Sequence, residues 1–443
     1  MVKRKIVETD SADDDDPKQP LSDNEDDEVM VSRKYQMDPN DLQVYYDRLF
    51  PFNEMFRWLS YGHDPDSENE NVDRTFFHRR EFTFITADEV WIRYQCFENK
   101  TQFKSCVRKV SPYRIEIGPL YNEPPSMKDA IGSSFRPVEK ELVFDIDMTD
   151  YDEVRVCCQD KQICNECWPL MSCAIRVLHE TLTKDFGFAH LLFVFSGRRG
   201  IHCWVGDRRA RALKDDARFA IGQYLSIHMG TEHGNAKLNV RQPMHHSLVR
   251  ASSICEPYFL RLLESQDWLS DEKGVDRVLG FLPDSCKETH SLLRDSWLGK
   301  NQDRSSSWKF GQLRKTAQTK SILRFAVREI MLFFVYPRLD INVTRKLNHL
   351  LKSPFVIHPG TGKVCVPIPI KEDGKWIVDK FDPLTQPKVE QLHRELNKNK
   401  DAKVRFDIQR TSLHKHVENF VKSFVEPLEE AERIRRRDLP AGL

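Results

Sequence analysis

Residues 141–147 read ELVFDID, and this segment decides the fold class. Apolar residues fill alternate positions from Leu142 to Ile146, which predicts a strand with one face in the core. Asp145 and Asp147 would then project together from the other face. Two carboxylates this close repel each other unless a cation lies between them, and their oxygens suit hard ions such as Mg²⁺. The same pattern also occurs at polar strand ends, so the pair alone does not decide between a metal site and a surface.

The segments around this strand predict a mixed α/β fold, with a mixed sheet flanked by helices. Period-two alternation predicts further strands at residues 81–85, 90–94, 113–117, 191–195, 201–205 and 364–368. Apolar periodicity predicts helices at residues 42–49 with Asp41 as the cap, after Pro51, after Trp168, and at residues 210–229 and 313–334. Strands are scarce between residues 236 and 320, which predicts an inserted helical subdomain.

The composition limits the class of protein. With 443 residues, 40% of them hydrophobic, the chain can build one large domain with an insertion, or two domains. No apolar run approaches a membrane span, and residues 1–10 lack the apolar stretch of a secretory signal, so we expect a soluble, intracellular protein. Eleven cysteines, an odd number, argue against a disulfide framework.

Charge is distributed unevenly, although the formal net charge is zero. Residues 1–30 carry four basic and eleven acidic side chains, which leaves the remaining 413 residues with a net charge of +7. We predict that residues 1–34 form a disordered acidic tail, because they hold too little apolar surface to order. A basic body is compatible with a nucleic-acid partner, although runs of charge often only keep a surface solvated.

A second segment, residues 196–204, reads SGRRGIHCW and connects two apolar strands. Its two glycines permit backbone conformations and close approaches that other residues do not. The side chains available to converge on one anion are Ser196, Arg198, Arg199 and His202. Arginine forks bind phosphate in a two-pronged geometry. The Lys-Ser/Thr end of a Walker loop is missing, and a basic surface hairpin is the alternative interpretation.

Three further residues could complete such a site. Asp340 follows the apolar segment 335–339 and would supply a third carboxylate, although it could equally cap a turn. Lys352 and His358 flank a short predicted strand and could donate to phosphate oxygens, although His358 could simply open the turn at residues 359–360. Alone, neither segment decides between these interpretations.

Four cysteines lie within eleven residues: Cys157, Cys158, Cys164 and Cys167. Four thiolates suit tetrahedral zinc, and the Cys-x2-Cys half has standard spacing. Because cysteine fills all four positions, the zinc would be structural rather than catalytic. An iron–sulfur cluster uses the same ligands, and four thiols without a metal are a third interpretation.

Together these segments resemble the small catalytic subunit of the eukaryotic and archaeal DNA primases. The resemblance covers residues 40–400. Its strongest segments are residues 141–152, 195–202 and 339–355. The strands before and after the helical insert at residues 236–320 predict one catalytic α/β domain at residues 35–235 and 321–443, and the cysteines at about residues 155–170 lie where the family has a zinc module.

The resemblance also implies a role for each matching residue. Asp145, Asp147 and Asp340 match the catalytic ligands of two Mg²⁺ or Mn²⁺ ions. The matching triphosphate contacts are Ser196, Arg198, Arg199, His202, Lys352 and His358. Glu81 and Arg93 match the lining of the nucleotide pocket. Glu116 matches a carboxylate near the sugar, where the eukaryotic pattern usually has Asp.

The resemblance implies a DNA-directed RNA polymerase of the primase type, a nucleotidyltransferase. Such an enzyme makes short RNA primers for replication from ribonucleoside triphosphates on single-stranded DNA. The resemblance further implies a larger primase subunit with an iron–sulfur cluster, a complex with DNA polymerase α, and a location in the nucleus.

Three alternatives share some of these features. A primase-polymerase that prefers deoxynucleotides would have the same aspartates and arginines. A catalytically silent nucleic-acid-binding subunit would not need the three aspartates or His202, and a metal-dependent nuclease would not need a triphosphate site. The retained residues therefore favour the polymerase.

Overall fold

The computed structural model describes residues 37–65, 72–227, 238, 240–398 and 407–437. The acidic tail predicted for residues 1–34 lies outside the described residues. None of the described helices combines the length and the apolar character that crossing a membrane requires.

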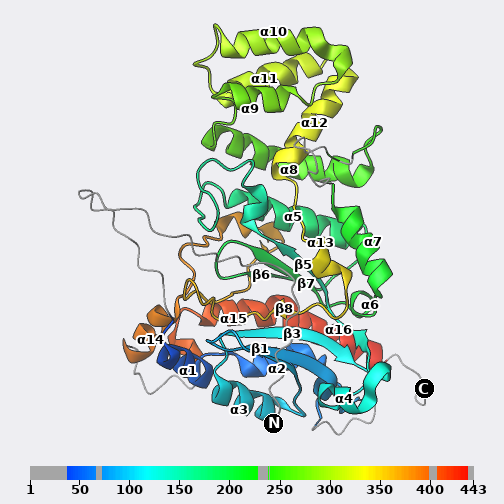
Figure 1. The fold of residues 1–443 in the computed structure, drawn as a ribbon, viewed down its shortest axis with the longest axis vertical. Coiled ribbons are helices and arrows are strands. Elements are labelled where there is room, and N and C mark those ends of the chain that lie inside the picture. Colours follow the sequence, from blue (N-terminus) through cyan, green and yellow to red (C-terminus); the bar gives the residue numbers. More distant parts are fainter. Residues whose placement is uncertain (1–36, 66–71, 228–237, 239, 399–406, 438–443) are drawn as a thin grey trace, which may run out of the picture. The chain divides into compact units, whose positions relative to one another are not determined.

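Two antiparallel sheets, named sheet A and sheet B, carry the strands of interest (Figure 1). In sheet A the order is β2–β1–β3–β4, and β8 also pairs with β3. Its strands are β1 (Arg80–Ile85), β2 (Trp91–Gln95), β3 (Arg114–Tyr121), β4 (Pro137–Glu139) and β8 (Leu351–Lys352). Sheet B, ordered β5–β7–β6, contains β5 (Leu142–Ile146), β6 (Leu191–Phe195) and β7 (Ile201–Val205). The α/β class is confirmed, but the pairings between described strands are antiparallel rather than of mixed direction.

Sheet A separates an apolar core from a polar face. Phe82 and Phe84 on β1 are fully buried, and the ring of Phe82 stacks on Phe103 with 4.8 Å between centroids. The alternate residues Glu81 and Thr83 take the opposite face, as the period of two requires. The helices on the apolar side are α1 (Pro39–Arg48), α2 (Phe52–Ser60) and α3 (Lys100–Val110).

A fully buried ion pair ties sheet A to sheet B. Arg80, which opens β1, donates two hydrogen bonds to Glu141, which precedes β5, at 2.9 and 3.0 Å. Neither side chain is exposed to solvent. The hydroxyl of Tyr61 donates a third hydrogen bond to Glu141 at 2.6 Å. Burial acts to raise the pKa of Glu141, but Arg80 and Tyr61 outweigh it and lower that pKa to about 2. We call this pair the Arg80–Glu141 clamp.

Helices dominate the chain between β7 and β8. They are α6 (Arg208–Arg211), α7 (Asp215–Leu225), α8 (His246–Ser265), α9 (Glu272–Leu279), α10 (Lys287–Leu298), α11 (Ser306–Ala317), α12 (Ser321–Val335) and α13 (Ile341–Arg345). Helix α8 packs against α12 and against α5 (Pro169–Lys184), and α9 packs against α10. The described part of residues 236–320 is thus helical, and its boundaries as a subdomain stay a prediction.

Three predicted helices have wrong boundaries. Asp38, not Asp41, caps α1 by accepting a backbone hydrogen bond at 2.8 Å, because Pro39 fits the first position of a helix. The helix predicted at residues 210–229 is broken into α6 and α7, and residues 228–229 lie outside the described part. The helix predicted at residues 313–334 is likewise two helices, α11 and α12, which pack against each other.

The segment after β8 is less regular than predicted. Instead of a strand at residues 364–368, isolated bridges join Ile357 to Val364 and Val194 to Pro367. Strand β8 ends at Lys352, so no strand of the described part connects it to His358. The remaining elements are β9 (Lys371–Glu372), β10 (Lys375–Trp376), α14 (Val389–Lys398), α15 (His414–Phe420) and α16 (Glu426–Arg437).

Candidate functional site

The three candidate aspartates lie on neighbouring stretches of backbone at one end of sheet B. Asp145 on β5 pairs with His202 on β7, and the His202 Nε2 atom lies 3.6 Å from an Asp145 carboxylate oxygen. Asp147 follows the end of β5 directly. The backbone N–H of Asp340 donates to the carbonyl of Asp145 at 3.1 Å, which brings the third aspartate beside the first.

The two aspartates of the strand end differ in their electrostatics. Burial, followed by the charge of Asp147, raises the pKa of Asp145 to about 7. Burial acts in the same direction on Asp147, but hydrogen bonds from Arg199 and Thr149 outweigh it and hold that pKa below its usual range. Burial and the neighbouring carboxylates thus disfavour the charged form of Asp145, and a bound cation would stabilise that form.

The SGRRG segment is a tight hairpin that passes close to both the aspartates and residue 358. Gly197 has a φ of +89°, and a Cβ atom there would lie 2.6 Å from the Cβ of His358. At Gly200 a Cβ atom would lie 2.5 Å from the carbonyl oxygen of Ile146. The Ser196 hydroxyl accepts the N–H of Gly200 at 3.0 Å and closes the turn. Both glycines are thus required by close approach.

Basic side chains surround this hairpin. The Arg199 Nε atom donates to both carboxylate oxygens of Asp147, at 2.6 and 2.9 Å. Lys352 Nζ lies 3.5 Å from the carbonyl of Ser196. Burial, then the charges of Lys352 and Arg198, lowers the pKa of His358 to about 2. Burial likewise lowers the pKa of His202 to about 3, so both imidazoles are neutral at physiological pH.

The structure therefore brings the predicted phosphate contacts and the three aspartates together. Ser196, Arg198 and Arg199 share the hairpin, His202 follows it on β7, and Lys352 reaches it from β8. The predicted roles of these residues stay predictions, since their geometry alone does not identify a ligand.

The remaining nucleotide-pocket candidates lie on the polar face of sheet A. Glu116 on β3 is directly opposite Lys352 on β8, and burial raises its pKa. Glu81 is buried and accepts two hydrogen bonds from Arg93, each at 3.1 Å. Tyr121 donates a further hydrogen bond to Glu81 at 3.0 Å. Glu116 thus lies next to Lys352. Glu81 already accepts hydrogen bonds from Arg93 and Tyr121, and it orients Arg93.

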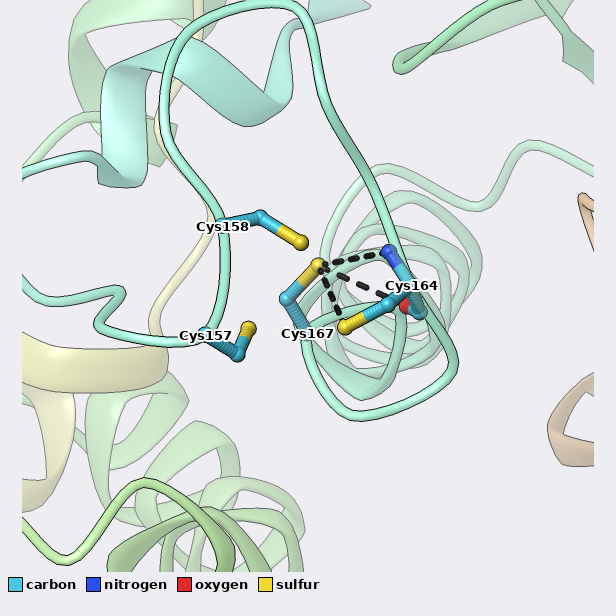
Figure 2. A group of neighbouring side chains, drawn as sticks. All are labelled: Cys157, Cys158, Cys164 and Cys167. Carbon is cyan, nitrogen blue, oxygen red and sulfur yellow. Dashed lines mark hydrogen bonds between the residues drawn. The ribbon is translucent and has the colours of Figure 1, made fainter. Parts of the chain in front are cut away.

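The four clustered cysteines form a second group of potential metal ligands (Figure 2). Their sulfur atoms all lie within 4.8 Å of one another, and the side chains converge from two turns of one loop. Tetrahedral zinc with bonds of about 2.3 Å needs sulfurs roughly 3.8 Å apart. The sulfurs of Cys164 and Cys167 are 3.9 Å apart, close to that requirement. The cluster can therefore hold a metal such as zinc.

Residues far away in the sequence hold this thiol loop in place. The Gln266 side-chain oxygen accepts the backbone N–H groups of Val156 and Cys157, at 2.8 and 3.1 Å. Trp268 donates to the carbonyl of Val154 at 2.6 Å. Sequence reasoning missed both supports, and no local signal could have found them, because they come from the helical region.

The two groups differ in how closely their ligand atoms approach. Within the described part of the chain, the four thiols are the one group of three or more His, Cys, Asp or Glu side chains whose ligand atoms lie close enough together to hold an ion. The aspartates make other contacts: Asp147 binds Arg199, and Asp340 accepts the N–H of Asn342 at 2.9 Å. As a donor set, three carboxylates on adjoining backbone fit hard divalent cations.

Comparison with known proteins identifies a family. The DNA primase small subunit family matches residues 144–370. The DNA primase small subunit of Drosophila melanogaster is 40% identical over 418 residues, covering 88% of this chain and 92% of that protein. The one of Schizosaccharomyces pombe is 41% identical over 374 residues, covering 82% and 79%. The one of Saccharomyces cerevisiae is 36% identical over 376 residues, covering 82% and 87%.

Proposed function

The chain belongs to the DNA primase small subunit family, and from this premise we propose that it is the catalytic subunit of a primase. The reaction is nucleotidyl transfer, in which ribonucleoside triphosphates are joined into short RNA primers on single-stranded DNA. The observation that carries the proposal is the convergence of three aspartates and a glycine-bounded arginine hairpin at one end of sheet B. A protein that only binds nucleic acid has no use for that pairing of carboxylates with a phosphate-binding segment.

In this mechanism the basic side chains around the hairpin hold the triphosphate. Arg198 and Lys352 contact its oxygens, and Arg199 contacts them while it orients Asp147. His202 and His358 are neutral, so each donates a single hydrogen bond and adds no charge. The 3′-hydroxyl of the primer then attacks the α-phosphate and loses its proton to solvent, the bond between the α- and β-phosphates breaks, and pyrophosphate leaves. Phosphoryl transfer of this kind depends mainly on positioning and electrostatics.

The aspartates Asp145, Asp147 and Asp340 would hold two Mg²⁺ or Mn²⁺ ions. When bound, such ions lower the pKa of the attacking hydroxyl and neutralise charge on the leaving oxygens. The raised pKa of Asp145 supports this assignment, because crowded carboxylates favour a bound cation. Glu116, beside Lys352, would accept a hydrogen bond from the sugar of the bound nucleotide.

The thiol cluster would hold structural zinc. All four positions are thiols on one short loop, and the supports from Gln266 and Trp268 fix that loop against the helical region. An all-cysteine set leaves no coordination position open for a substrate. We therefore assign the cluster to the folding of the loop rather than to the reaction.

Partners and location follow from the same proposal. A small subunit implies a larger one, so we infer a heterodimer with the large primase subunit that acts together with DNA polymerase α. Replication in a eukaryotic cell takes place in the nucleus, and we infer a nuclear location on that ground. Expression of the chain with a fluorescent tag would test this, and exclusion from the nucleus would contradict it.

The decisive experiment measures primer synthesis on single-stranded DNA, with the large subunit present. The wild type, Asp145→Asn and the control Asp284→Asn are compared, since the Asp284 side chain is 96% exposed and lies in the helical region. Ribonucleotides and deoxynucleotides are supplied in separate reactions with Mg²⁺ or Mn²⁺. We expect RNA products from the wild type and the control, and none from folded Asp145→Asn.

Two results would contradict the proposal. Equal synthesis by Asp145→Asn and the wild type would exclude the aspartate site. Products formed only from deoxynucleotides would assign the chain to the primase-polymerases instead.

A further inference from the structure

The polar face of sheet A continues from the phosphate-binding residues to an open strand edge. Lys352, Glu116 and Thr83 lie opposite one another on β8, β3 and β1. Arg93 on β2 extends this row, because it binds Glu81 on the same face. The row thus connects the candidate triphosphate site with β2, the last strand of the sheet.

A second row runs beside the first and contains two residues that the proposed mechanism does not use. Ile85 on β1 is paired with Arg114 on β3 and with Trp91 on β2. Directly paired residues of antiparallel strands share a face, and so do alternate residues of one strand. Arg114 therefore lies on the face that carries Glu116, and Trp91 lies on the face that carries Arg93.

Arg114 is a half-buried cation next to the candidate triphosphate site. Within the described part of the chain, its guanidinium forms no hydrogen bond or ion pair. Its charge acts on two site residues: it opposes the burial that raises the pKa of Glu116, and it adds to the lowered pKa of His358. A cation in this position can take an anion from outside the protein.

Aromatic rings and cations alternate at the β2 edge. Trp91 is 52% exposed, although it is the largest kind of apolar side chain. The ring of Tyr94 has Lys128 Nζ at 3.8 Å and the Arg93 guanidinium at 4.8 Å from its centroid. Tyr94 has a φ of +57° at a register shift between β1 and β2, an irregularity of the kind that re-aims side chains at a sheet edge.

We propose that Trp91 and Arg114 bind the single-stranded DNA template beside the candidate catalytic site. Trp91 stacks on an unpaired base, and Arg114 contacts a backbone phosphate. Exposed aromatic rings interleaved with cations are the features by which proteins hold single strands without reading their sequence. This inference rests on the proposed polymerase function, and it adds the surface that receives the template.

The charge of the surface around Trp91 and Arg114 favours a single strand of DNA over a second free triphosphate as its ligand. One unpaired arginine matches a phosphodiester, which carries a single negative charge. A triphosphate carries several, and the cations that match it already surround the hairpin. Glu81, the carboxylate that binds Arg93, is itself buried and paired, so it does not oppose a phosphate near Arg93.

The first test measures binding of a labelled oligothymidylate to the full-length chain by fluorescence anisotropy, without nucleotides or divalent ions. We expect Trp91→Ala to raise the Kd about 10-fold, as for the loss of one base–aromatic stack. Trp91→Phe should keep most of the affinity. Arg114→Gln should reduce the slope of log affinity against log salt by roughly 0.7, as for one lost phosphate contact to a single strand.

Matched controls separate stacking from general effects. Trp308 on α11 is also an exposed tryptophan with an arginine, Arg304, 5.3 Å from its ring centre, but it lies in the helical region. Val90 is 50% exposed and precedes Trp91 directly. Trp308→Ala and Val90→Ala should bind the oligonucleotide like the wild type.

The second test measures primer synthesis with the large subunit present. Trp91→Ala should raise the KM for template and leave the KM for the incoming ribonucleotide unchanged. A raised KM for the nucleotide with an unchanged KM for the template would overturn the proposal, because it would mean that Trp91 contacts a nucleotide. Unchanged binding by Trp91→Ala, or equal losses in Trp308→Ala, would also overturn it.

The two proposals fail in distinguishable ways. If Asp145→Asn abolishes synthesis while Trp91→Ala binds and extends normally, only the template inference fails. If Asp145→Asn retains full synthesis, the proposed catalytic site fails, whatever the binding assay gives.

Discussion

The thiol cluster begins ten residues after Asp147, yet it and the aspartate cluster are built in different ways. The four sulfurs already lie within 4.8 Å of one another on a loop fixed by Gln266 and Trp268. The aspartates instead keep protein partners, with Asp147 on Arg199 and Asp340 on its own helix. A preassembled all-protein set suits an ion that stays, whereas ligands with other partners suit ions that arrive and leave with a substrate. The difference matches the proposed division between a structural metal at the thiols and catalytic ions at the aspartates.

Chelation should give the largest contrast between the two clusters. A mild chelator should abolish primer synthesis completely, and excess Mg²⁺ should restore it, because carboxylates hold such ions weakly. Zinc should stay bound in stoichiometric amount throughout, as elemental analysis of the same sample would report. Loss of zinc in step with activity would contradict the division of roles.

Removing the partner of Asp147 should have the next largest effect. Arg199→Ala should lower kcat/KM for the ribonucleotide roughly 10- to 100-fold, the range expected for a lost hydrogen bond to a charged group. Because Arg199 lowers the pKa of Asp147, its removal should also move the acid limb of the pH–rate profile to higher pH. Arg304→Ala, an exposed arginine of the helical region, is the control. A profile that does not move would show that the contact with Asp147 is incidental.

Loss of one thiol should affect stability more than chemistry. Cys167→Ser should release zinc and lower the Tm by several degrees, or about 2 kcal/mol for a domain of this size. Cys96→Ser, which changes a cysteine outside the cluster, should keep both the zinc and the Tm. Steady-state kinetics of the surviving folded enzyme should show a nearly unchanged KM for the ribonucleotide. Full zinc content in Cys167→Ser would exclude the four-thiol site.

The smallest predicted effect is a pH dependence of stability that comes from Asp145. Its pKa of about 7 lies above the unfolded value of about 3.9, so the folded chain binds the extra proton between these limits. Stability from this group is present at low pH and is lost as the pH rises towards 7. Without divalent ions, the Tm of the wild type should therefore fall relative to Asp145→Asn across this window.

Mg²⁺ provides the matching check, because it competes with that proton. It should raise the Tm of the wild type more at about pH 8 than at about pH 5.5. The Tm of Asp145→Asn should respond less at either pH. Equal responses of both proteins would mean that Asp145 does not hold the ion.

Local sequence predicted the strands of sheet B better than the helices. The bounds of β6 and β7 agree with the prediction, because five apolar residues in β6 and four in β7 enclose a turn with two glycines. The break between α11 and α12 falls at residues 318–320, which contain neither glycine nor proline. Packing of the two helices against each other decides that break, and it is not encoded locally. The cap of α1 could have been predicted from the sequence, since Asp38 directly precedes Pro39.

The residues of the candidate site also differ in whether local sequence could predict them. Asp145, Asp147 and the hairpin could be predicted because each is a short segment of telling residues, and Asp340 because it matches a family. The contact of Arg199 with Asp147 joins two separate segments, so it required the fold. Trp91 and Arg114 share a face only through the register of three strands. Sequence patterns identify residue types at a site, whereas pairing across strands determines which of them meet.

The Arg80–Glu141 clamp has a consequence for how substrates exchange. Separating the two sheets like the halves of a hinge would break this buried ion pair, at a cost of about 3–5 kcal/mol. Such an open form would be populated less than roughly 1% of the time. Nucleotides and template should therefore arrive and depart through movements of side chains and loops while the two sheets stay together. Turnover in this chain would then be limited by local rearrangement or by its partner subunit rather than by domain opening.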